Sequence, residues 1–370
     1  MNARPFLHGP ETEALIEALW LGQYGHSRLV EKFEHDIAEF LGVPDMVAVA
    51  SGTDALHIAL LAAEVGPGDE VVVPSQTYCA TVQAILATGA QPRFIEINPA
   101  TLCVEADDVL AAVTPATRVV LPVLYGGRAV DLSALTEVLD SRRITVIEDA
   151  AHAFGSVCGD KLVGARREAL TCFSFGPIKN LTCGQGGGIV PRTREEAGRL
   201  RTLRALGIAD SQRQRAQTTT YAVQQYGLRA TMSALNAAIG RVQLRYFDAV
   251  AALRKSLWQS YADGLSGIGG VEVVDVDVAR SVPFNCVVRL VHRDAAFHAL
   301  RSRGIGVGVH YPPNHLQPAF ARWRRSLPVT EESDRQIMSL PFHPAMSSED
   351  VQRVVAAVRE TALEAGTCAS

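Results

Sequence analysis

The stretch EVVVPSQTYCATVQAILATG, residues 70–89, decides the fold, because its apolar pattern changes from that of a strand to that of a helix. EVVVP is a run of β-branched residues typical of a buried strand, and CATVQAILATG has the character of a helix. Similar strand-like runs, each separated from the next by a helical pattern, are MVAVA (46–50), PRFIEI (92–97), RVVLPV (118–123) and ITVIED (144–149). This alternation predicts an α/β fold with a mostly parallel sheet that is sandwiched by helices.

The alternation ends after about residue 235. A helical pattern covers roughly 234–265, and a strand-like run, FNCVVRLV (284–291), and a final helix near 348–364 follow it. These elements predict a smaller α+β domain at the C-terminal end. We therefore expect a large domain over 1–240, which begins with a helical segment, and a small domain over 241–370.

Composition narrows the functional classes. The net charge of −4 with acids and bases intermixed argues against a nucleic-acid partner. An odd number of cysteines, seven, without a CxxC pair favours a reducing cytoplasm over a disulfide framework. No apolar run is long enough to span a membrane, and the first residues lack a signal core. The ten histidines show no metal-ligand spacing, so we expect a cytoplasmic protein without a membrane partner or a metal site.

The turn after the first strand has the character of an anion site. Gly52 and Thr53 would open a helix whose backbone N–H groups and dipole favour a phosphate. An ordinary helix that is capped by Ser51 or Thr53 would look the same in the sequence. The sequence contains neither GxGxxG nor GxxxxGK[ST], which disfavours a nicotinamide dehydrogenase and a P-loop enzyme.

Two further strand ends carry groups that suit a planar ligand. Tyr78 lies at the turn after EVVVP, where it would either cover a ring or pack in the core. The strand ITVIED ends in Asp149, a carboxylate that would pair with a protonated ring nitrogen or cap a helix. His152 follows three residues later and would bond the same ligand or serve as a structural histidine.

A single lysine, Lys179, stands among apolar residues and glycines in FSFGPIKNLTCGQGGG (173–188). A desolvated lysine has a lowered pKa and attacks carbonyl carbons as a neutral amine, whereas a surface lysine would need no such setting. Ser174 offers a hydroxyl to an anion, and the glycines allow a close backbone approach. An anion cradle, a ring cover, a strand-end Asp and a lysine are together the groups that pyridoxal phosphate requires.

With these residues in place, the sequence resembles the DegT-type sugar aminotransferases, within the fold-type I pyridoxal-phosphate enzymes. The resemblance covers nearly the whole chain. Its motifs are SGTDALHIAL, PSQTYCATVQAI, IEDAAHAFGS, FSFGPIKNLTCGQGGG, GVGVHYPPNHLQPAF and SLPFHPAMSSEDVQRV. The resemblance implies a homodimer with active sites at the subunit interface. It also implies small-molecule substrates, an amino acid donor and a keto sugar that is usually nucleotide-linked.

The resemblance also implies roles for single residues. Lys179 would form the Schiff base with pyridoxal 5'-phosphate and move protons, Asp149 would pair with the pyridinium nitrogen, and His152 would lie near the phenolic oxygen. His310 and Tyr311 would lie near the substrate. The phosphate and the face of the ring would be contacted by Gly52, Thr53, Ser174 and Tyr78.

The chain departs from the family's usual motifs at a few positions. GLRATM (227–232) stands where a GLNxRM-like run is common, so Arg229 replaces an Asn that reaches the neighbouring subunit's phosphate. An arginine can bind that phosphate bidentately, or it has left the site. Leu124 replaces a histidine, and Gly176 and Ile178 alter the run before Lys179. These changes concern the choice of substrate more than the chemistry.

The resemblance favours a ping-pong transaminase that aminates a nucleotide-linked keto-deoxysugar, with a dTDP-4-keto-6-deoxyhexose as the best single candidate. Pyridoxamine phosphate would link its two half-reactions. A keto-cyclitol aminotransferase of the scyllo-inosose type and a non-catalytic regulator that binds pyridoxal phosphate are the alternatives. Lys179 argues against a pyridoxamine-dependent dehydratase, because those relatives carry a histidine there. The pathway, antibiotic or cell-surface polysaccharide, stays open.

Overall fold

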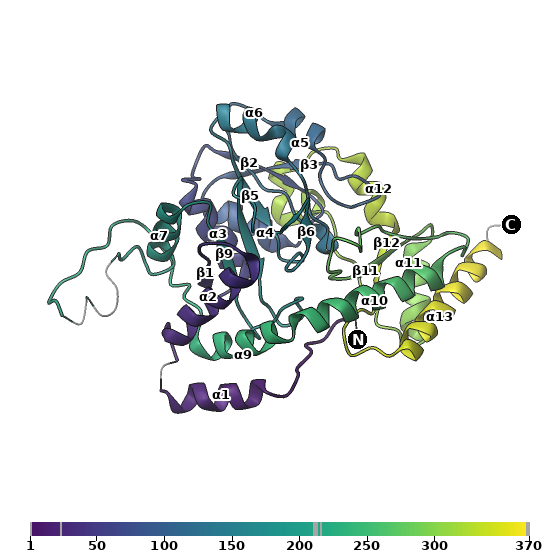
Figure 1. Ribbon diagram of the computed structural model, residues 1–370. Helices are drawn as coiled ribbons and strands as arrows, with labels where there is room; N and C mark the ends of the chain where they lie inside the picture. Colours follow the sequence, from purple (N-terminus) through teal and green to yellow (C-terminus); the bar gives the residue numbers. More distant parts are fainter. Residues whose placement is uncertain (1, 23, 210–213, 215–216, 368–370) are drawn as a thin grey trace.

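The computed structural model describes residues 2–22, 24–209, 214 and 217–367 (Figure 1). Its central sheet has seven strands in these residues, in the order β1-β9-β8-β5-β4-β2-β3. β9 runs antiparallel to both of its neighbours, and all other neighbours are parallel. The strands are β1 (Val47–Val49), β2 (Glu70–Pro74), β3 (Gln91–Ile95), β4 (Thr117–Val120), β5 (Thr145–Asp149), β8 (Ala169–Ser174) and β9 (Gly187–Val190). The predicted α/β class with a mostly parallel sheet is confirmed.

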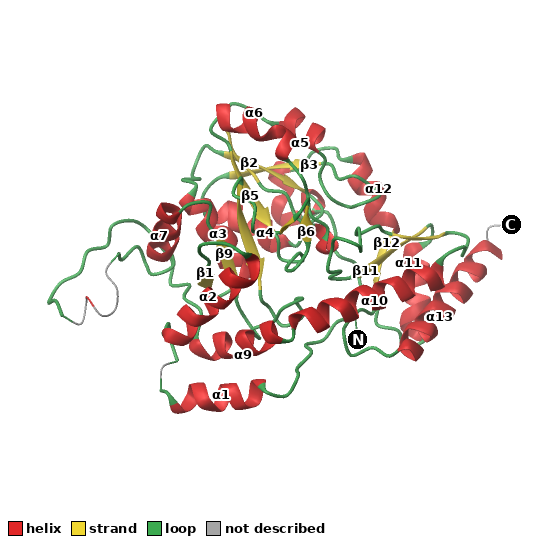
Figure 2. Cartoon of the chain, in the orientation of Figure 1, coloured by secondary structure: helices red, strands yellow, loops and turns green. Residues whose placement is uncertain are grey.

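Helices cover both faces of this sheet (Figure 2). In β2, Val71 and Val73 pack in the apolar cluster on one face, and Val72 packs in the cluster on the other. One face is covered by α3 (Gly52–Ala62), α4 (Cys79–Ala87) and α7 (Arg194–Leu203). The other is covered by α2 (Arg28–Leu41), α5 (Ala106–Ala112), α6 (Thr136–Ser141) and α9 (Ala234–Arg245). Burial on both sides explains the unbroken valine run that identified this strand.

The single helix that the sequence predicts over 234–265 is two helices. α9 ends at Arg245, and α10 (Phe247–Leu265) begins after a break at Tyr246, where φ is −103° and ψ is 4°. α9 packs on α2 and on α1 (Glu11–Trp20), whereas α10 packs on the last helix, α13 (Ser348–Thr367). Phe247 points into the core at the break, with its ring edge-on to Phe154. The turn therefore lets each half bury its own apolar side.

A second, antiparallel sheet lies in the C-terminal part, in the order β10-β11-β12. Its strands are β10 (Val271–Val273), β11 (Cys286–Leu290) and β12 (Ile337–Leu340). It shares an apolar core with α10, α13 and α11 (Arg293–Ser302), as the α+β prediction requires. α12 (Pro328–Gln336) and a short β6–β7 hairpin (Val157–Cys158, Lys161–Leu162) complete the labelled elements. The domain division at 240/241 stays a prediction, and the packing partners change at Tyr246.

The structure bears on three expectations drawn from composition, and its findings apply to the described residues only. No helix among them is long and apolar enough to cross a bilayer. Their cysteines are free thiols, and Cys368 lies outside the described residues. No group of three or more His, Cys, Asp or Glu side chains in the described ranges could hold a metal ion.

Candidate active site

A cavity of about 310 Å³ opens where β1, β5 and β8 reach their carboxyl ends, beside the turn after β2. This is the edge at which parallel α/β sheets bind ligands. Eight of the residues singled out in the sequence line it: Gly52, Thr53, Tyr78, Asp149, His152, Ser174, Lys179 and Tyr311. The fold therefore gathers residues from five separate chain segments around one space.

Lys179 lies in the turn after β8 and is partly buried. Its Nζ lies 4.6 Å from the centroid of the Phe284 ring. Burial removes water from the ammonium and lowers the pKa of Lys179 to about 8, although the negative charge of Asp149 acts in the opposite direction. The amine is consequently available as a nucleophile and as a proton carrier near neutral pH.

Asp149 is the last residue of β5 and is buried. Its Oδ2 accepts a hydrogen bond from Thr81 Oγ1 at 2.7 Å, and its Oδ1 accepts one from the Ala151 N–H at 3.2 Å. Burial raises the pKa of Asp149, while these two donors and the Lys179 charge lower it. A carboxylate in this setting is well suited to pair with a cation inside the cavity.

His152 stacks on Phe284, with ring centroids 3.9 Å apart and an angle of 12° between the planes. Its Nε2 lies 3.3 Å from the Tyr311 hydroxyl, and its buried Nδ1 has no hydrogen-bond partner. Burial, followed by the nearby positive charge of Lys179, holds the pKa of His152 well below its ordinary value. The ring is therefore neutral, with one nitrogen left for a ligand or a water molecule.

The structure shows an ordinary cap at the N-terminus of α3, and this cap leaves the first N–H groups of the helix without a partner within the helix. Ser51 caps the helix, because its Oγ accepts from the Asp54 N–H at 3.0 Å and its carbonyl accepts from the Ala55 N–H. The N–H groups of Gly52 and Thr53 then remain for an anion. A Cβ on Gly52 would lie 2.7 Å from Ser174 Cβ, so glycine allows β8 to bring its hydroxyl against the helix.

Tyr78 lies on the rim of the cavity, at the start of α4. Its side chain is exposed, and its ring centroid lies 5.4 Å from that of Tyr311. The alternative that Tyr78 packs in the core is thus wrong. An exposed aromatic ring at the mouth of a cavity is free to cover a planar ligand.

Two of the predicted residues lie outside the lining. His310 is next to the cavity, and its Nδ1 lies 2.8 Å from Ser339 Oγ. Arg229 is exposed and forms an isolated bridge with Ala205. It is not among the residues that line the cavity of its own chain.

Sequence reasoning missed Phe284 and Thr81. Phe284 arrives from the segment before β11, and a long-range contact fixes its backbone, because its N–H donates to the Gly126 carbonyl at 2.8 Å. Thr81 lies one helical turn after Tyr78. Its hydrogen bond to Asp149 links the beginning of α4, which follows β2, to the end of β5. A polar residue three positions after a strand-end aromatic is the one signal that points to it.

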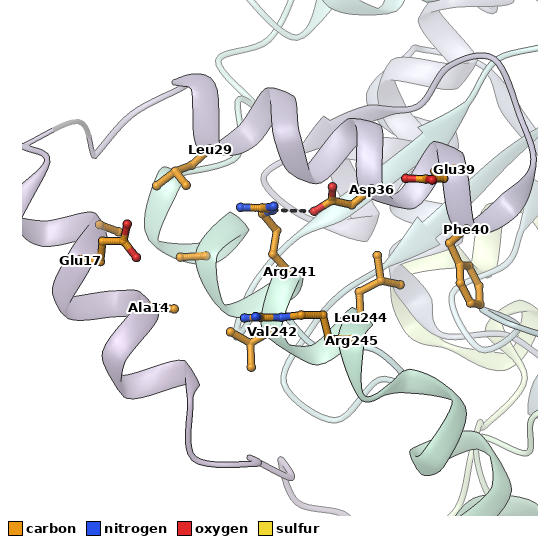
Figure 3. Close-up of a pocket in the computed structure, with 12 residues that line it drawn as sticks. Ala14, Glu17, Leu29, Asp36, Glu39, Phe40, Arg241, Val242, Leu244 and Arg245 are labelled. Carbon is orange, nitrogen blue, oxygen red and sulfur yellow. Dashed lines mark hydrogen bonds and ion pairs between the residues drawn. The ribbon is translucent and has the colours of Figure 1, made fainter.

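A second cavity, of about 550 Å³, lies between α1, α2 and α9 (Figure 3). Arg241 points toward Asp36 across it and forms an ion pair at 2.5 Å. None of the predicted site residues lines this cavity. Eight of them line the cavity at the sheet edge instead.

The groups at the sheet edge fit pyridoxal phosphate. A glycine-lined helix N-terminus suits the phosphate, a buried carboxylate suits the ring nitrogen, and a lysine of lowered pKa suits the aldehyde. The unpartnered His152 Nδ1 leaves a buried polar atom for the ligand or for ordered water.

Comparisons with known proteins agree with this assignment. Residues 7–359 match the model of the DegT/DnrJ/EryC1/StrS aminotransferase family. The aminotransferase TlmJ from Streptoalloteichus hindustanus is 33% identical, with a TM-score of 0.92 and 99% of each chain covered. DesV of S. venezuelae, solved in complex with a ketimine intermediate, is 35% identical, with a TM-score of 0.88 over 98% of this chain and 99% of that one. The sugar aminotransferase CalS13 from Micromonospora echinospora is 28% identical, with a TM-score of 0.90 over 97% and 99%. This chain belongs to the DegT/DnrJ/EryC1/StrS aminotransferase family, and it is a sugar aminotransferase whose cofactor is pyridoxal phosphate.

Proposed function

We propose that the enzyme transfers an amino group from glutamate or glutamine to a nucleotide-linked keto-deoxysugar by a ping-pong mechanism. The observation that supports it most is the pair formed by Lys179 and Asp149, an amine of lowered pKa and a buried carboxylate in one cavity. A dTDP-4-keto-6-deoxyhexose is the acceptor that the family resemblance favours.

Each charged group then has a defined task. When bound, pyridoxal phosphate supplies an electron-withdrawing ring to the carbon that carries the amino group. Asp149 holds a negative charge at the ring nitrogen and so keeps that nitrogen protonated. Lys179 Nζ would hold the aldehyde carbon of the bound cofactor, and as a free amine it would move a proton to and from the α-carbon of the donor amino acid.

The remaining lining residues orient the reactants. We assign the phosphate to the N–H groups of Gly52 and Thr53 and to the Ser174 hydroxyl, because these donors converge at one end of the cavity. Tyr78 would cover the ring from the exposed side. His152 and Tyr311, which lie within 3.3 Å of one another, would bond the oxygen atoms of the cofactor and of the substrate.

His310 is proposed as an indirect contributor to the sugar site. Its Nδ1 faces Ser339, and its carbonyl accepts a hydrogen bond from the Tyr125 hydroxyl. These contacts fix the backbone on which Tyr311 stands. His310 would therefore act on the sugar chiefly through the position of Tyr311.

We also propose a cytoplasmic homodimer without membrane or nucleic-acid partners. Exposed apolar residues on α1 and after it support the dimer, because such patches on a monomer mark interaction surfaces. These residues are Ile16, Leu19, Trp20, Leu21 and Tyr24. In a dimer, Arg229 would be exposed to the partner's site and could bind the partner's phosphate bidentately.

A substrate panel tests the function. Purified enzyme is incubated with glutamate or glutamine and either keto sugar nucleotides or keto-cyclitols, and mass spectrometry detects the amine. Amination of a dTDP-4-keto-6-deoxyhexose is the expected result. Amination of the cyclitols alone would favour the scyllo-inosose alternative, and a yellow protein that glutamate never bleaches would favour a regulator. A Lys179→Ala variant that transaminated at the wild-type rate would overturn the mechanism.

A further inference from the structure

Two buried hydroxyl groups continue the hydrogen bonding of Asp149 into the protein. Thr81 Oγ1 donates to Asp149 Oδ2 at 2.7 Å, and Thr77 Oγ1 lies 2.9 Å from Thr81 Oγ1. Thr77 and Thr81 are both buried, Thr77 in the turn after β2 and Thr81 in the first turn of α4. The carboxylate is thus tied to a neighbouring segment of the chain as well as to its own strand.

The direction of these hydrogen bonds is fixed by proton count. A hydroxyl carries one proton, and an ionised carboxylate only accepts. Because Thr81 gives its proton to Asp149, Thr77 must be the donor in the contact with Thr81. The protons therefore point one way, from Thr77 through Thr81 to Asp149, and each bond strengthens the next.

Asn314 holds the beginning of this chain of hydroxyls. Its Nδ2 donates to the carbonyls of Thr77 at 2.7 Å and Ser75 at 3.0 Å, and its own N–H donates to the Ser75 carbonyl at 2.9 Å. His315 adds a bond from its N–H to Ser75 Oγ at 3.0 Å. Asn314, His315 and Ser75 are buried, so these bonds clamp the turn between β2 and α4.

The clamp also joins two parts of the site. Asn314 follows Tyr311 by three residues, and Tyr311 lines the cavity beside Tyr78. The turn that Asn314 holds carries Tyr78 and leads to Thr81. The buried Asn314 amide consequently helps to fix both Tyr78 at the rim of the cavity and Thr81, which donates to Asp149.

We propose that Thr77 and Thr81 are positioning residues that hold the Asp149 carboxylate in the orientation required by the ring nitrogen of the cofactor, and that Asn314 fixes them. The inference deepens the proposed function and rests on the role of Asp149 within it. Neither threonine needs to touch a substrate for this role.

The test replaces each hydroxyl with a methyl group of the same shape. Pyridoxal phosphate is titrated into the cofactor-free forms of Thr81→Val, Thr77→Val and Thr81→Ser, and absorbance gives the dissociation constant. We expect Thr81→Val to weaken binding about tenfold and Thr77→Val about threefold, because the first loses a hydrogen bond to a charged group. Thr81→Ser keeps the hydroxyl and should stay within about twofold of the wild type.

Thr171→Val is the matched control. The Thr171 hydroxyl is buried in β8 and donates at 2.7 Å to Glu148, the carboxylate next to Asp149 in sequence. Thr171→Val should lower the melting temperature about as much as Thr81→Val, since both remove one bond to a buried carboxylate. It should leave the affinity for pyridoxal phosphate unchanged.

A double-mutant cycle separates the possible outcomes. If Thr81 acts through Asp149, adding Thr81→Val to Asp149→Ala should weaken binding no further. The proposal for the two threonines is overturned if Thr81→Val binds the cofactor as tightly as Thr171→Val does. It is also overturned if the Thr81→Val substitution weakens binding equally in the presence and in the absence of the Asp149 carboxylate. If Asp149→Ala itself binds pyridoxal phosphate as tightly as the wild type, the proposed role of Asp149 fails, and the proposed role of the threonines fails with it.

Discussion

The contact between Gly52 and Ser174 allows a quantitative test of the phosphate site. In Gly52→Ala the added Cβ would lie 2.7 Å from Ser174 Cβ, 3.0 Å from its Oγ and 3.3 Å from its Cα. Carbon atoms in contact lie about 3.5–4.0 Å apart, so the first helical turn and β8 must separate by about 1 Å. Overpacking of this kind costs about 1–3 kcal/mol, and here it moves the donors proposed to hold the phosphate.

We therefore expect Gly52→Ala to weaken the binding of pyridoxal phosphate by about 5- to 150-fold, which is about 1–3 kcal/mol converted to a ratio of dissociation constants. Titration of the cofactor-free variant by absorbance measures this change. Pyridoxal, which lacks the phosphate, should lose much less affinity. The comparison of the two ligands separates damage to the phosphate site from general damage to the cavity.

Gly198→Ala serves as the control for this prediction. Gly198 lies inside α7, and a Cβ there meets no atom within 4 Å. Alanine should stabilise that helix by about 0.5–1 kcal/mol without changing cofactor affinity. The reasoning is refuted if Gly52→Ala binds pyridoxal phosphate as tightly as Gly198→Ala, or if it loses the same affinity for pyridoxal.

Three other predictions address chemistry, stability and assembly. The rate at which the cofactor-free enzyme attaches pyridoxal phosphate should rise with pH and level off above about 8, because the neutral form of Lys179 is the nucleophile and its lowered pKa lies there; stopped-flow absorbance that showed a rate falling between pH 6 and 8 would contradict this. Arg204→Met should destabilise the fold by about 1.5–3 kcal/mol in urea unfolding, because the buried Glu34 carboxylate loses the shorter of its two ion pairs and keeps only the pair with Arg201 at 3.7 Å; a loss of less than about 1 kcal/mol would refute the reasoning. Trp20→Glu should shift the protein toward monomer in analytical ultracentrifugation, because 86% of the Trp20 side chain is exposed on α1, and an unchanged dimer would remove this face from the proposed interface.

The sequence predicts the large sheet well because burial on both faces leaves a simple signal. β2 and α4 lie where EVVVP and CATVQAILA stand, and β5 ends at Asp149 as expected. The local pattern of apolar residues does not tell which residues distant in the sequence will pack together. At the break at Tyr246, the Phe247 ring packs against Phe154, which is distant in the sequence. The helical repeat of apolar residues continues across the break, so the sequence pattern gives no sign of it.

The same limit applies to the site. Lys179 and Asp149 stood out in the sequence because a lone lysine among glycines and a carboxylate at the end of an apolar strand are unusual, and the structure places both in one cavity. Phe284 and Asn314 did not, because aromatic and amide residues are common in any chain, and only folding brings Phe284 to Lys179 and Asn314 to the turn before α4. Arg229 shows the reverse case, in which a residue prominent in the sequence is exposed and does not line its own chain's cavity.

The neighbouring carboxylates at the end of β5 show how the sheet selects one of two similar groups for the site. Successive side chains of a strand point to opposite faces. Asp149 shares its face with Ile147, on the side covered by α3 and α4, and its carboxylate meets Thr81 and the cavity. Glu148 points to the other side, where Thr171 donates to it and burial raises its pKa.

Both carboxylates are buried and both accept a hydrogen bond from a threonine hydroxyl, so neither burial nor hydrogen bonding distinguishes them. The alternation of the strand does, because only the Asp149 face opens where the N-terminus of α3 and Lys179 converge. A one-residue shift in the register of β5 would present Glu148 to the cavity instead, on a longer side chain and without Thr81 as its partner.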